Sequence, residues 1–484
     1  MGNKLIGFAP DLDPTTPGIV LDCSNMVPSI RGMKAAPSLV NPGMPALPAT
    51  VLGGATLVKL DNTRRLIVGT QTKLYEEIAG AWSDISRTTG GAYTGSASSA
   101  WRFTQFGNAT VATNNADVLQ QSTTGAFSDI AGAPKAAIVE TVAGFVFAFN
   151  TVDPTYGTRP DGWWNSGLYD QAVWTPSQST QCANGRIIDT PGEIRAGRAL
   201  GPDIVVYKET SMYYGTYQGP PIIWAFNVIS NQIGAPCQEA VVSIGTAHLF
   251  LGNDNFYSFD GTRPTPIGDS VKNWFFRDQN RSYKQTVVSV HDRLNSLVYW
   301  YYVSTQSTGA IDSAIVYNYK TGQWGRANRS VEAAVDFING QITWSTLGTI
   351  ADTWQHLPTV PYNSPFWTSV ATQPSIIDTT HTIQTLTGDA GQSTITTGDF
   401  GDDESYSLLQ YVRMRFAQDP SSATMSTQER TTLGGLFSPG VTTTYEDGKF
   451  DVDSSARYHR ALMTFQGNCE VIGYSPKLVP DGLA

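Results

Sequence analysis

The most regular feature of the chain is a succession of short apolar segments separated by turn residues. ATLVKL (55–60), RRLIVGT (64–70) and KLYEEI (73–78) alternate polar and apolar positions or are rich in β-branched residues, and similar segments recur through residue 350. This pattern indicates short β-strands. Helical periodicity is scarce; one short helix is predicted over 269–279, with Asp269 as its cap.

A strand–turn–strand unit is repeated 45 residues apart. LYEEIAGAWSDIS (74–86) matches LQQSTTGAFSDIA (119–131), and VYNYKTGQWGRA (316–327) is a weaker copy. The repeated positions are Gly80, Trp82, Asp84, Gly125, Phe127, Asp129, Gly322 and Trp324. We interpret the glycines as turn residues with positive φ, the aromatic residues as packing side chains within a blade, and the aspartates as turn caps.

A repeat of this length with several short strands is typical of β-propellers, in which stacked blades bury each other's faces. We predict about six blades over residues 56–350, although five or seven would also fit. The predicted blades lie near 56–100, 101–135, 136–196, 197–238, 239–282 and 283–350.

The two ends of the chain differ from this central part. Residues 1–55 are rich in Pro, Gly and small residues, which predicts an extended arm and a linker. Residues 351–484 begin with a Pro- and aromatic-rich connector and return to strand patterns, interrupted by a helix-compatible stretch at 422–435. We predict that 351–484 and the N-terminal arm build a second β-rich platform or sandwich domain.

Charge restricts the possible partners. Only 15% of the residues are charged, the formal net charge is −10, and there is no run of Lys or Arg. Nucleic-acid-binding proteins usually carry a basic stripe. The acidic balance fits either plain solubility or a surface past which DNA slides without sticking. No secretion signal and no membrane segment is expected.

The sequence offers little catalytic chemistry. Its five histidines form no metal-binding pattern, its four cysteines are far apart, and it has neither a nucleophile elbow nor a phosphate-binding loop. His291 is expected to be buried beside Asp292, and the acidic run 398–405 to be a solvated loop in preference to a calcium site. No catalytic residue, metal ligand or cofactor is predicted, and the protein is not expected to be an enzyme.

Two features keep a carbohydrate hypothesis open. Asp84 and Asp129 could form the carboxylate pair of a glycosidase, although their repetition favours a structural role. Four aromatic residues within 155–177 could form a sugar-stacking platform or cover the core under a long insertion. They are Trp163, Trp164, Tyr169 and Trp174.

Several stretches together resemble the tail nozzle proteins of short-tailed bacteriophages, also called packaged-DNA stabilisation or tail accessory proteins. In DCSNMVPSIRGMKAAPSLV (22–40), Asn25, Pro28 and Gly32 lead into an apolar element, as in that family. The stretches 64–86, 101–114 and 251–271 also resemble that family in layout and composition. The resemblance is one of layout and carries no functional residue across.

The resemblance implies a structural virion protein of the viral tail, assembled in the host cytoplasm. Its copies would form a homo-hexamer below the portal–adaptor ring, the head-to-tail connector, and extend the DNA channel. The ring would help to retain packaged DNA, contact DNA transiently during ejection, and carry tail fibres or tailspikes. The alternatives are a virion-borne carbohydrate-binding or depolymerising β-propeller and a cytosolic scaffold propeller that binds a peptide.

Overall fold

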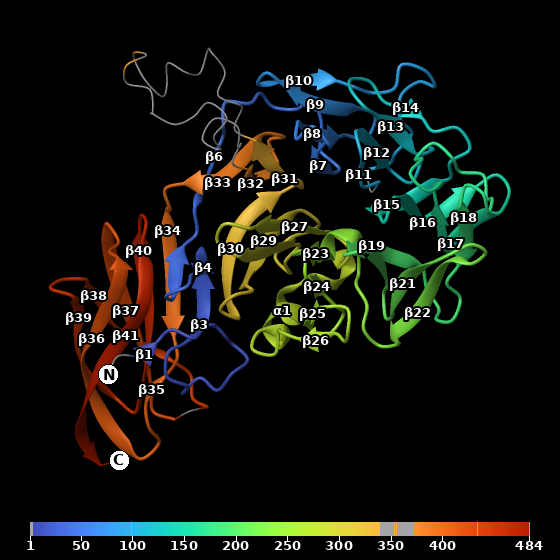
Figure 1. Cartoon of the computed structure of the whole chain (residues 1–484). Coiled ribbons are helices and arrows are strands. Elements are labelled where there is room, and N and C mark those ends of the chain that lie inside the picture. The colour runs from blue at the N-terminus through green and yellow to red at the C-terminus, as the bar shows by residue number, and fades with distance from the viewer. Residues whose placement is uncertain are drawn as a thin grey trace.

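The structure, a computed structural model, describes residues 3–97, 99–338, 353, 355, 372–432 and 434–483. These residues form an all-β molecule with two parts, a ring of blades and a sandwich (Figure 1). The helical elements among them are short: α1 (Lys272–Asp278) and the 3₁₀ turns η1 (Gln238–Ala240) and η2 (Arg281–Tyr283).

Six antiparallel four-stranded units follow one another along the chain and form six blades. The first blade contains β7 (Gly54–Val58), β8 (Arg64–Gly69), β9 (Leu74–Ile78) and β10 (Ala81–Asp84). The second contains β11 (Arg102–Phe106), β12 (Ala109–Thr113), β13 (Gln120–Ser122) and β14 (Ser128–Asp129). The third contains β15 (Lys135–Val142), β16 (Phe145–Asp153), β17 (Gly157–Asn165) and β18 (Ala183–Arg186). The fourth blade contains β19 (Ile194–Leu200), β20 (Asp203–Lys208), β21 (Met212–Gly219) and β22 (Ile223–Ser230). The fifth contains β23 (Val241–Ser243), β24 (His248–Leu251), β25 (Phe256–Phe259) and β26 (Thr265–Pro266). The sixth contains β27 (Val287–Asp292), β28 (Leu297–Tyr302), β29 (Ile311–Asn318) and β30 (Gln323–Val331). The first strand of each blade packs beside the first strand of the next.

A seventh sheet closes the ring. It contains β31 (Ala333–Ile338), β32 (Thr372–Ile377), β33 (Ile383–Gly388) and, from the N-terminal arm, β6 (Ser38–Val40). Strand β31 contacts both β27 of the sixth blade and β7 of the first. The predicted β-propeller is therefore confirmed, with six blades continuous in sequence and a closing blade that draws strands from both ends of the chain. The ring extends past the predicted border at residue 350, because β32 and β33 find their pairing partner in β31.

The predicted second β-rich domain is also confirmed, as a two-sheet sandwich. One sheet contains β2 (Gly7–Phe8), β3 (Ile19–Ser24), β34 (Gln392–Thr397), β40 (Tyr458–Gln466), β37 (Ser422–Arg430) and β38 (Ser438–Thr444), with β35 (Phe400–Gly401) beside β40. The other contains β4 (Met26–Pro28), β5 (Met33–Ala35), β41 (Glu470–Leu483), β36 (Ser405–Gln418) and β39 (Lys449–Ala456), with β1 (Asn3–Lys4) beside β41. As predicted, the N-terminal arm supplies strands to both sheets.

Within the stretch 422–435, predicted to be compatible with a helix, residues Ser422–Arg430 instead form strand β37. Its buried residues Ala423, Met425 and Thr427 alternate with more exposed ones, which is the period of a strand with one face on a core. Its polar but almost uncharged composition concealed this alternation.

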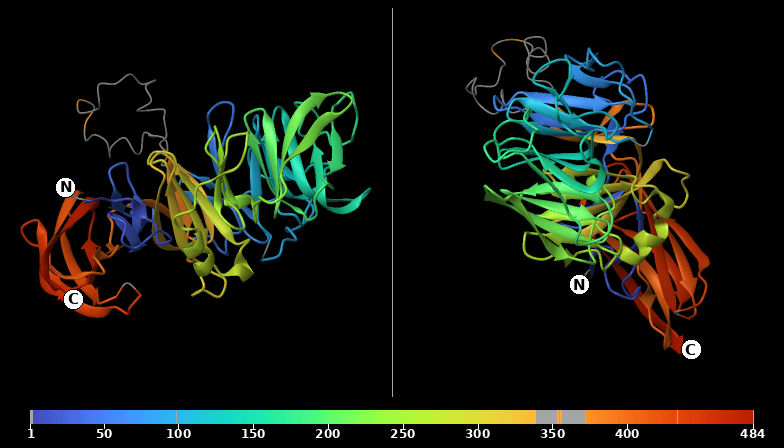
Figure 2. Two further views of the ribbon diagram at one scale, coloured as in Figure 1. Left: turned by 90° about the horizontal axis from the view of Figure 1, so that it is seen from below. Right: turned by 90° about the vertical axis from the view of Figure 1, so that its right-hand side faces the viewer.

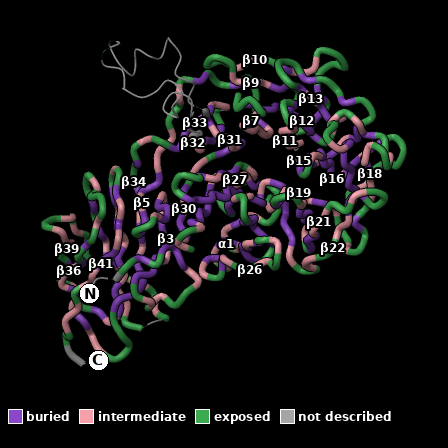
Figure 3. Tube along the Cα trace, viewed as in Figure 1, coloured by how far each residue is buried: buried purple, intermediate pink, exposed green. Residues whose placement is uncertain are grey.

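The two parts share one sheet and one core. Strand β4 pairs with β30, so the sixth blade continues through β4 and β5 into the sandwich as a ten-stranded sheet. A single buried cluster runs from Trp300 and Trp324 of the sixth blade to Met463 and Val471 of the sandwich (Figure 3). Arg326 of β30 also pairs with Asp22 of β3 at 2.6 Å. The joint is therefore packed and hydrogen-bonded.

The arm also caps the helix. The Asp11 carboxylate accepts hydrogen bonds from the first-turn N–H groups of Asn273 and Trp274, at 2.6 and 3.1 Å. Asp269, the predicted cap, instead accepts from the side chains of Asn255 and Lys272. A residue more than 250 positions away thus takes the capping role.

Candidate functional site

The repeated motif marks the outer hairpin of three blades. Gly80, Gly125 and Gly322 lie between the third and fourth strands of the first, second and sixth blades, with φ of 79°, 67° and 72°. In the first blade, Ala79 also has positive φ, which gives the two-residue turn preferred in hairpins. The glycines thus have the conformation that the motif predicts.

The aromatic residues of the motif lie in different environments. Phe127 and Trp324 are each 2% exposed; Phe127 packs between the first and second blades, and Trp324 lies 4.5 Å from the ring of Tyr317. Trp82, expected to be buried within a blade, is only half-buried. Its Nε1 donates to the carbonyl of Pro45 at 3.0 Å, because it covers the linker that runs between the seventh and first blades.

The two aspartates lie on different blades and have different partners. Asp84 accepts hydrogen bonds from Lys73 Nζ (2.8 Å) and the Ser86 amide (3.0 Å), so it caps a turn. Partial burial acts to raise the pKa of Asp84, but these hydrogen bonds outweigh it and hold the pKa below its ordinary value. A glycosidase acid requires the opposite shift. Asp129 lies on β14 of another blade and binds Gln120 and Arg87 instead of capping a turn.

The aromatic cluster of the third blade covers the core. Trp163, Trp164 and Trp174 are 8%, 6% and 3% exposed, and belong to the buried clusters on either side of that blade. Tyr169 alone of the four is exposed, at 78%. One ring offers no platform for a sugar, so of the two interpretations the core cover is the one that the burial supports.

The other candidate polar residues have local structural partners. Asp399 is fully buried between Arg430 and Arg460, whereas Asp402 accepts from two turn amides of the acidic run. His291 is half-buried, its Nε2 lies 3.4 Å from the Tyr319 hydroxyl, and burial lowers the pKa of His291 to about 4. In the part of the chain that the structure describes, no three His, Cys, Asp or Glu side chains gather as a metal site would require.

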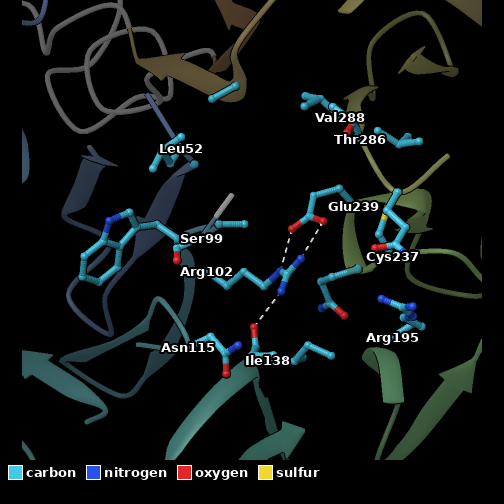
Figure 4. A pocket seen from close by; sticks show the side chains of 18 of the residues that line it. Leu52, Ser99, Arg102, Asn115, Ile138, Arg195, Cys237, Glu239, Thr286 and Val288 are labelled. Carbon is cyan, nitrogen blue, oxygen red and sulfur yellow. Dashed lines mark hydrogen bonds and ion pairs between the residues drawn. The ribbon is translucent and has the colours of Figure 1, made fainter. Parts of the chain in front are cut away.

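A cavity of about 720 Å³ lies on the propeller axis. Its lining comes from the inner strands and the segments that lead into them, and includes Leu52, Ser99, Asn115, Ile138 and Val288 (Figure 4). It mixes small, apolar and charged residues and belongs to no single blade.

An ion pair crosses this cavity. Arg102, on β11, donates from Nε and Nη2 to the two carboxylate oxygens of Glu239, in η1 before the fifth blade, at 2.7 and 2.9 Å. Its third nitrogen, Nη1, donates to the Ala137 carbonyl at 2.7 Å. The guanidinium therefore joins the second, third and fifth blades across the axis (Figure 4).

Electrostatics keep this pair ionised. Burial acts to raise the pKa of Glu239, but Arg102 beside it outweighs burial and holds the pKa below its ordinary value. Next to the pair, the Gln238 side chain exchanges two hydrogen bonds with the backbone of Gly197. A bidentate pair and its neighbours thus span the axial cavity. Sequence reasoning missed both partners, since they lie 137 residues apart and belong to no motif.

Comparisons with known proteins assign the chain to no family. No protein-family description and no curated protein matches the chain. Solved structures that it resembles include YCF48 bound to D1 peptide (11% identity, TM-score 0.35, 62% of this chain and 86% of that one) and the Pan2 WD40 domain of Neurospora crassa (8%, 0.38, 72% and 94%). Human WBSCR16 is a further similar structure, with 8% identity, a TM-score of 0.33, and coverage of 60% of this chain and 85% of that one. Among the described residues, none of the helices has the length and apolarity to cross a bilayer.

Proposed function

We propose that the chain is a structural subunit of a virion, the ring-forming tail nozzle of a short-tailed phage. Copies of it, six in number, extend the DNA channel below the portal–adaptor ring and carry tail fibres or tailspikes. The observation that supports this proposal best is the ten-stranded sheet that runs from the sixth blade into the sandwich.

A ring that holds packaged DNA bears load across each subunit, and a flexible linker between two domains would yield to it. Relative domain motion is the default where domains meet over a small polar interface. Here the joint has a paired strand, a shared apolar core and the Arg326–Asp22 ion pair. Such a joint suits a rigid wall element better than a transient binding module.

In this proposal the DNA channel lies at the centre of the ring of copies and not along the propeller axis, where Arg102 and Glu239 join blades across the cavity. The net charge of −10 and the lack of a run of Lys or Arg suit such a wall, since proteins hold DNA phosphates mainly with Lys and Arg.

Two observations count against the carbohydrate alternative. The tryptophans of the third blade are buried, and Asp84 and Asp129 are each paired with a cation.

The test is assembly with the connector. The chain is produced together with the portal and adaptor of a short-tailed phage whose genome encodes it, and the particles are imaged by electron microscopy. We expect a six-fold ring with a central hole below the adaptor. A chain that never joins portal–adaptor particles would refute the proposal.

A further inference from the structure

Two further arginines reach the axial cavity beside the pair of Arg102 and Glu239. Arg195 and Arg198 both lie on β19, the first strand of the fourth blade, and both line the cavity, at whose wall Arg195 is seen in Figures 2 and 4 as part of that blade. The cavity volume of about 720 Å³ falls within the range of about 300–1,000 Å³ that is typical of small-molecule sites. The cavity thus has room for a small molecule and carries cationic groups that can orient it.

A β-bulge places both arginines on the same side of their strand. Residues three apart on a regular strand point to opposite faces of the sheet. On β19, however, the step from Ile194 to Ala196 opposes a step of one residue on β20, so Arg195 is an extra residue in the strand. The extra residue shifts the alternation by one position, and Arg195 comes to line the same cavity as Arg198. Bulges are enriched beside functional sites, where they redirect a side chain.

Neither guanidinium is saturated by the residues that the structure describes. Arg195 Nη2 lies 2.8 Å from a carboxylate oxygen of Glu193, and Arg198 Nη1 lies 3.5 Å from one of Glu140. The Nε atoms of both arginines are buried and find no hydrogen-bond partner among the described residues. Arg102, by contrast, donates from all three of its nitrogens. Because the side chains of Arg195 and Arg198 are 22% and 31% exposed, the protein does not seal them off.

The carboxylates of the lining are already used by other donors. Both oxygens of Glu239 accept from the arginine that crosses the axis. Glu193 also accepts from the Asn150 side chain at 2.8 Å, and Glu332 accepts from the Val51 amide at 2.9 Å. The described lining is therefore short of acceptors for the two guanidinium groups of β19. An oxyanion is the acceptor that a guanidinium fork matches.

Glu140 compensates the charge of Arg198 only weakly. The two side chains are 3.5 Å apart, and the other oxygen of Glu140 accepts from the Ala199 amide at 3.3 Å. Burial raises the pKa of Glu140, and Arg198 does not offset this effect. Glu239 shows the opposite balance, since Arg102 holds its pKa below the ordinary value. Arg198 therefore lacks the strong counter-charge that Arg102 has.

We propose that the axial cavity binds a small molecule through a carboxylate or phosphate group that Arg195 and Arg198 hold. The planar guanidinium matches the geometry of both oxyanions. Apolar lining residues, among them Leu52, Ile138 and Val288, lower the local dielectric and so strengthen such a contact. The site lies within one copy of the chain, so this proposal goes beyond the ring of the proposed function and does not rest on it.

The test measures binding to the full chain by isothermal titration calorimetry. Inorganic phosphate and citrate are the two probes, and sodium chloride at matched ionic strength is the control titration. Arg195→Gln and Arg198→Gln each remove one guanidinium from the cavity. Arg186→Gln is the matched control variant, since Arg186 has the same charge but is 51% exposed on β18 and does not line the cavity. Circular dichroism and the urea unfolding midpoint, measured without a probe, verify that each variant folds.

We expect the wild type and Arg186→Gln to bind at least one probe with the same dissociation constant, and each cavity variant to raise it at least about tenfold. Binding of phosphate alone assigns the site to phosphate groups, binding of citrate alone assigns it to carboxylates, and binding of both assigns it to either oxyanion. Hydrogen exchange on the wild type tests the site without any substitution, because a bound probe should slow exchange in β19.

Four results would overturn the proposal. They are heat from neither probe beyond the sodium chloride control, binding that survives both cavity substitutions, an equal loss of binding in Arg186→Gln, and exchange in β19 that a saturating probe leaves unchanged. The nozzle proposal is judged separately, by assembly with portal–adaptor particles, and none of these four results bears on it.

Discussion

The ion pair across the propeller axis gives a quantitative prediction. Glu239→Gln keeps the shape of the side chain and removes its charge, which leaves the Arg102 guanidinium facing a neutral amide. The pair is bidentate, and its side chains are 18% and 29% exposed for Arg102 and Glu239. Its exposure is intermediate between that of an exposed pair, which contributes at most about 1 kcal/mol to stability, and that of a fully buried pair, whose disruption costs about 3–5 kcal/mol. We expect a loss of about 2 kcal/mol in the free energy of unfolding.

The pH dependence of this loss has a definite sign. The pKa of Glu239 in the folded protein lies below its ordinary value, since Arg102 outweighs the effect of burial. The stabilisation is therefore fully present above the unfolded-state pKa of about 4.3 and disappears as the pH falls through the folded-state pKa. The difference between wild type and Glu239→Gln should shrink accordingly on acidification.

Urea unfolding followed by tryptophan fluorescence, at about pH 7 and about pH 3, measures both effects. Asp161→Asn is the matched control, because Asp161 and Arg186 form the same bidentate geometry at 2.8 Å with Arg186 51% exposed. Its effect should stay below about 1 kcal/mol. If Glu239→Gln costs no more than this control, or costs the same at both pH values, the axial pair does not hold the blades together.

Other substitutions test the packing. Phe127→Ala, at a buried site, should lower the free energy of unfolding by about 3–5 kcal/mol. Trp82→Ala, at a half-buried site with one hydrogen bond, should lower it by about 1–2 kcal/mol. Equal urea midpoints for the two variants would contradict their different burial. Gly32→Ala would place a Cβ 2.1 Å from the Val471 carbonyl oxygen, so it should destabilise the arm by more than about 1 kcal/mol and make it susceptible to limited proteolysis. A variant as resistant to the protease as the wild type would refute this. Asp399→Ala removes a buried carboxylate and leaves Arg430 and Arg460, whose side chains are 9% and 21% exposed, without their partner. It should lower the unfolding free energy by about 3–5 kcal/mol, and a thermal melt unchanged from the wild type would disprove this.

The propeller could be predicted from local signals. A hairpin turn, its glycine and the aromatic residue after it lie within a few positions, so copies at Gly80, Gly125 and Gly322 are visible as repeats. The seventh blade leaves no such trace. Its fourth strand, β6, comes from the N-terminal arm, and β31 and β32 are separated by more than thirty residues.

The candidate site could not be predicted for a similar reason. Arg102 and Glu239 are two ordinary charged residues until the ring closes and brings β11 and η1 to the same axis. Trp82 packs against the core cluster between the seventh and first blades, but it is only half-buried, because the motif sets the position of a side chain on its hairpin and not what lies above it. Here the linker at Pro45 covers the ring, an outcome of tertiary packing alone.

The interleaving of distant segments sets an order on folding during synthesis. Strands of the N-terminal arm are made long before their partners: Ser29 donates to Glu470, 441 residues later, and β5 pairs with β41. Contacts this distant close slowly, and domains in a growing chain fold in order of synthesis. The strands of the first six blades are therefore all made before β5 can pair with β41. A chain cut before β41 keeps these blades but lacks the strand that pairs with both β5 and β36.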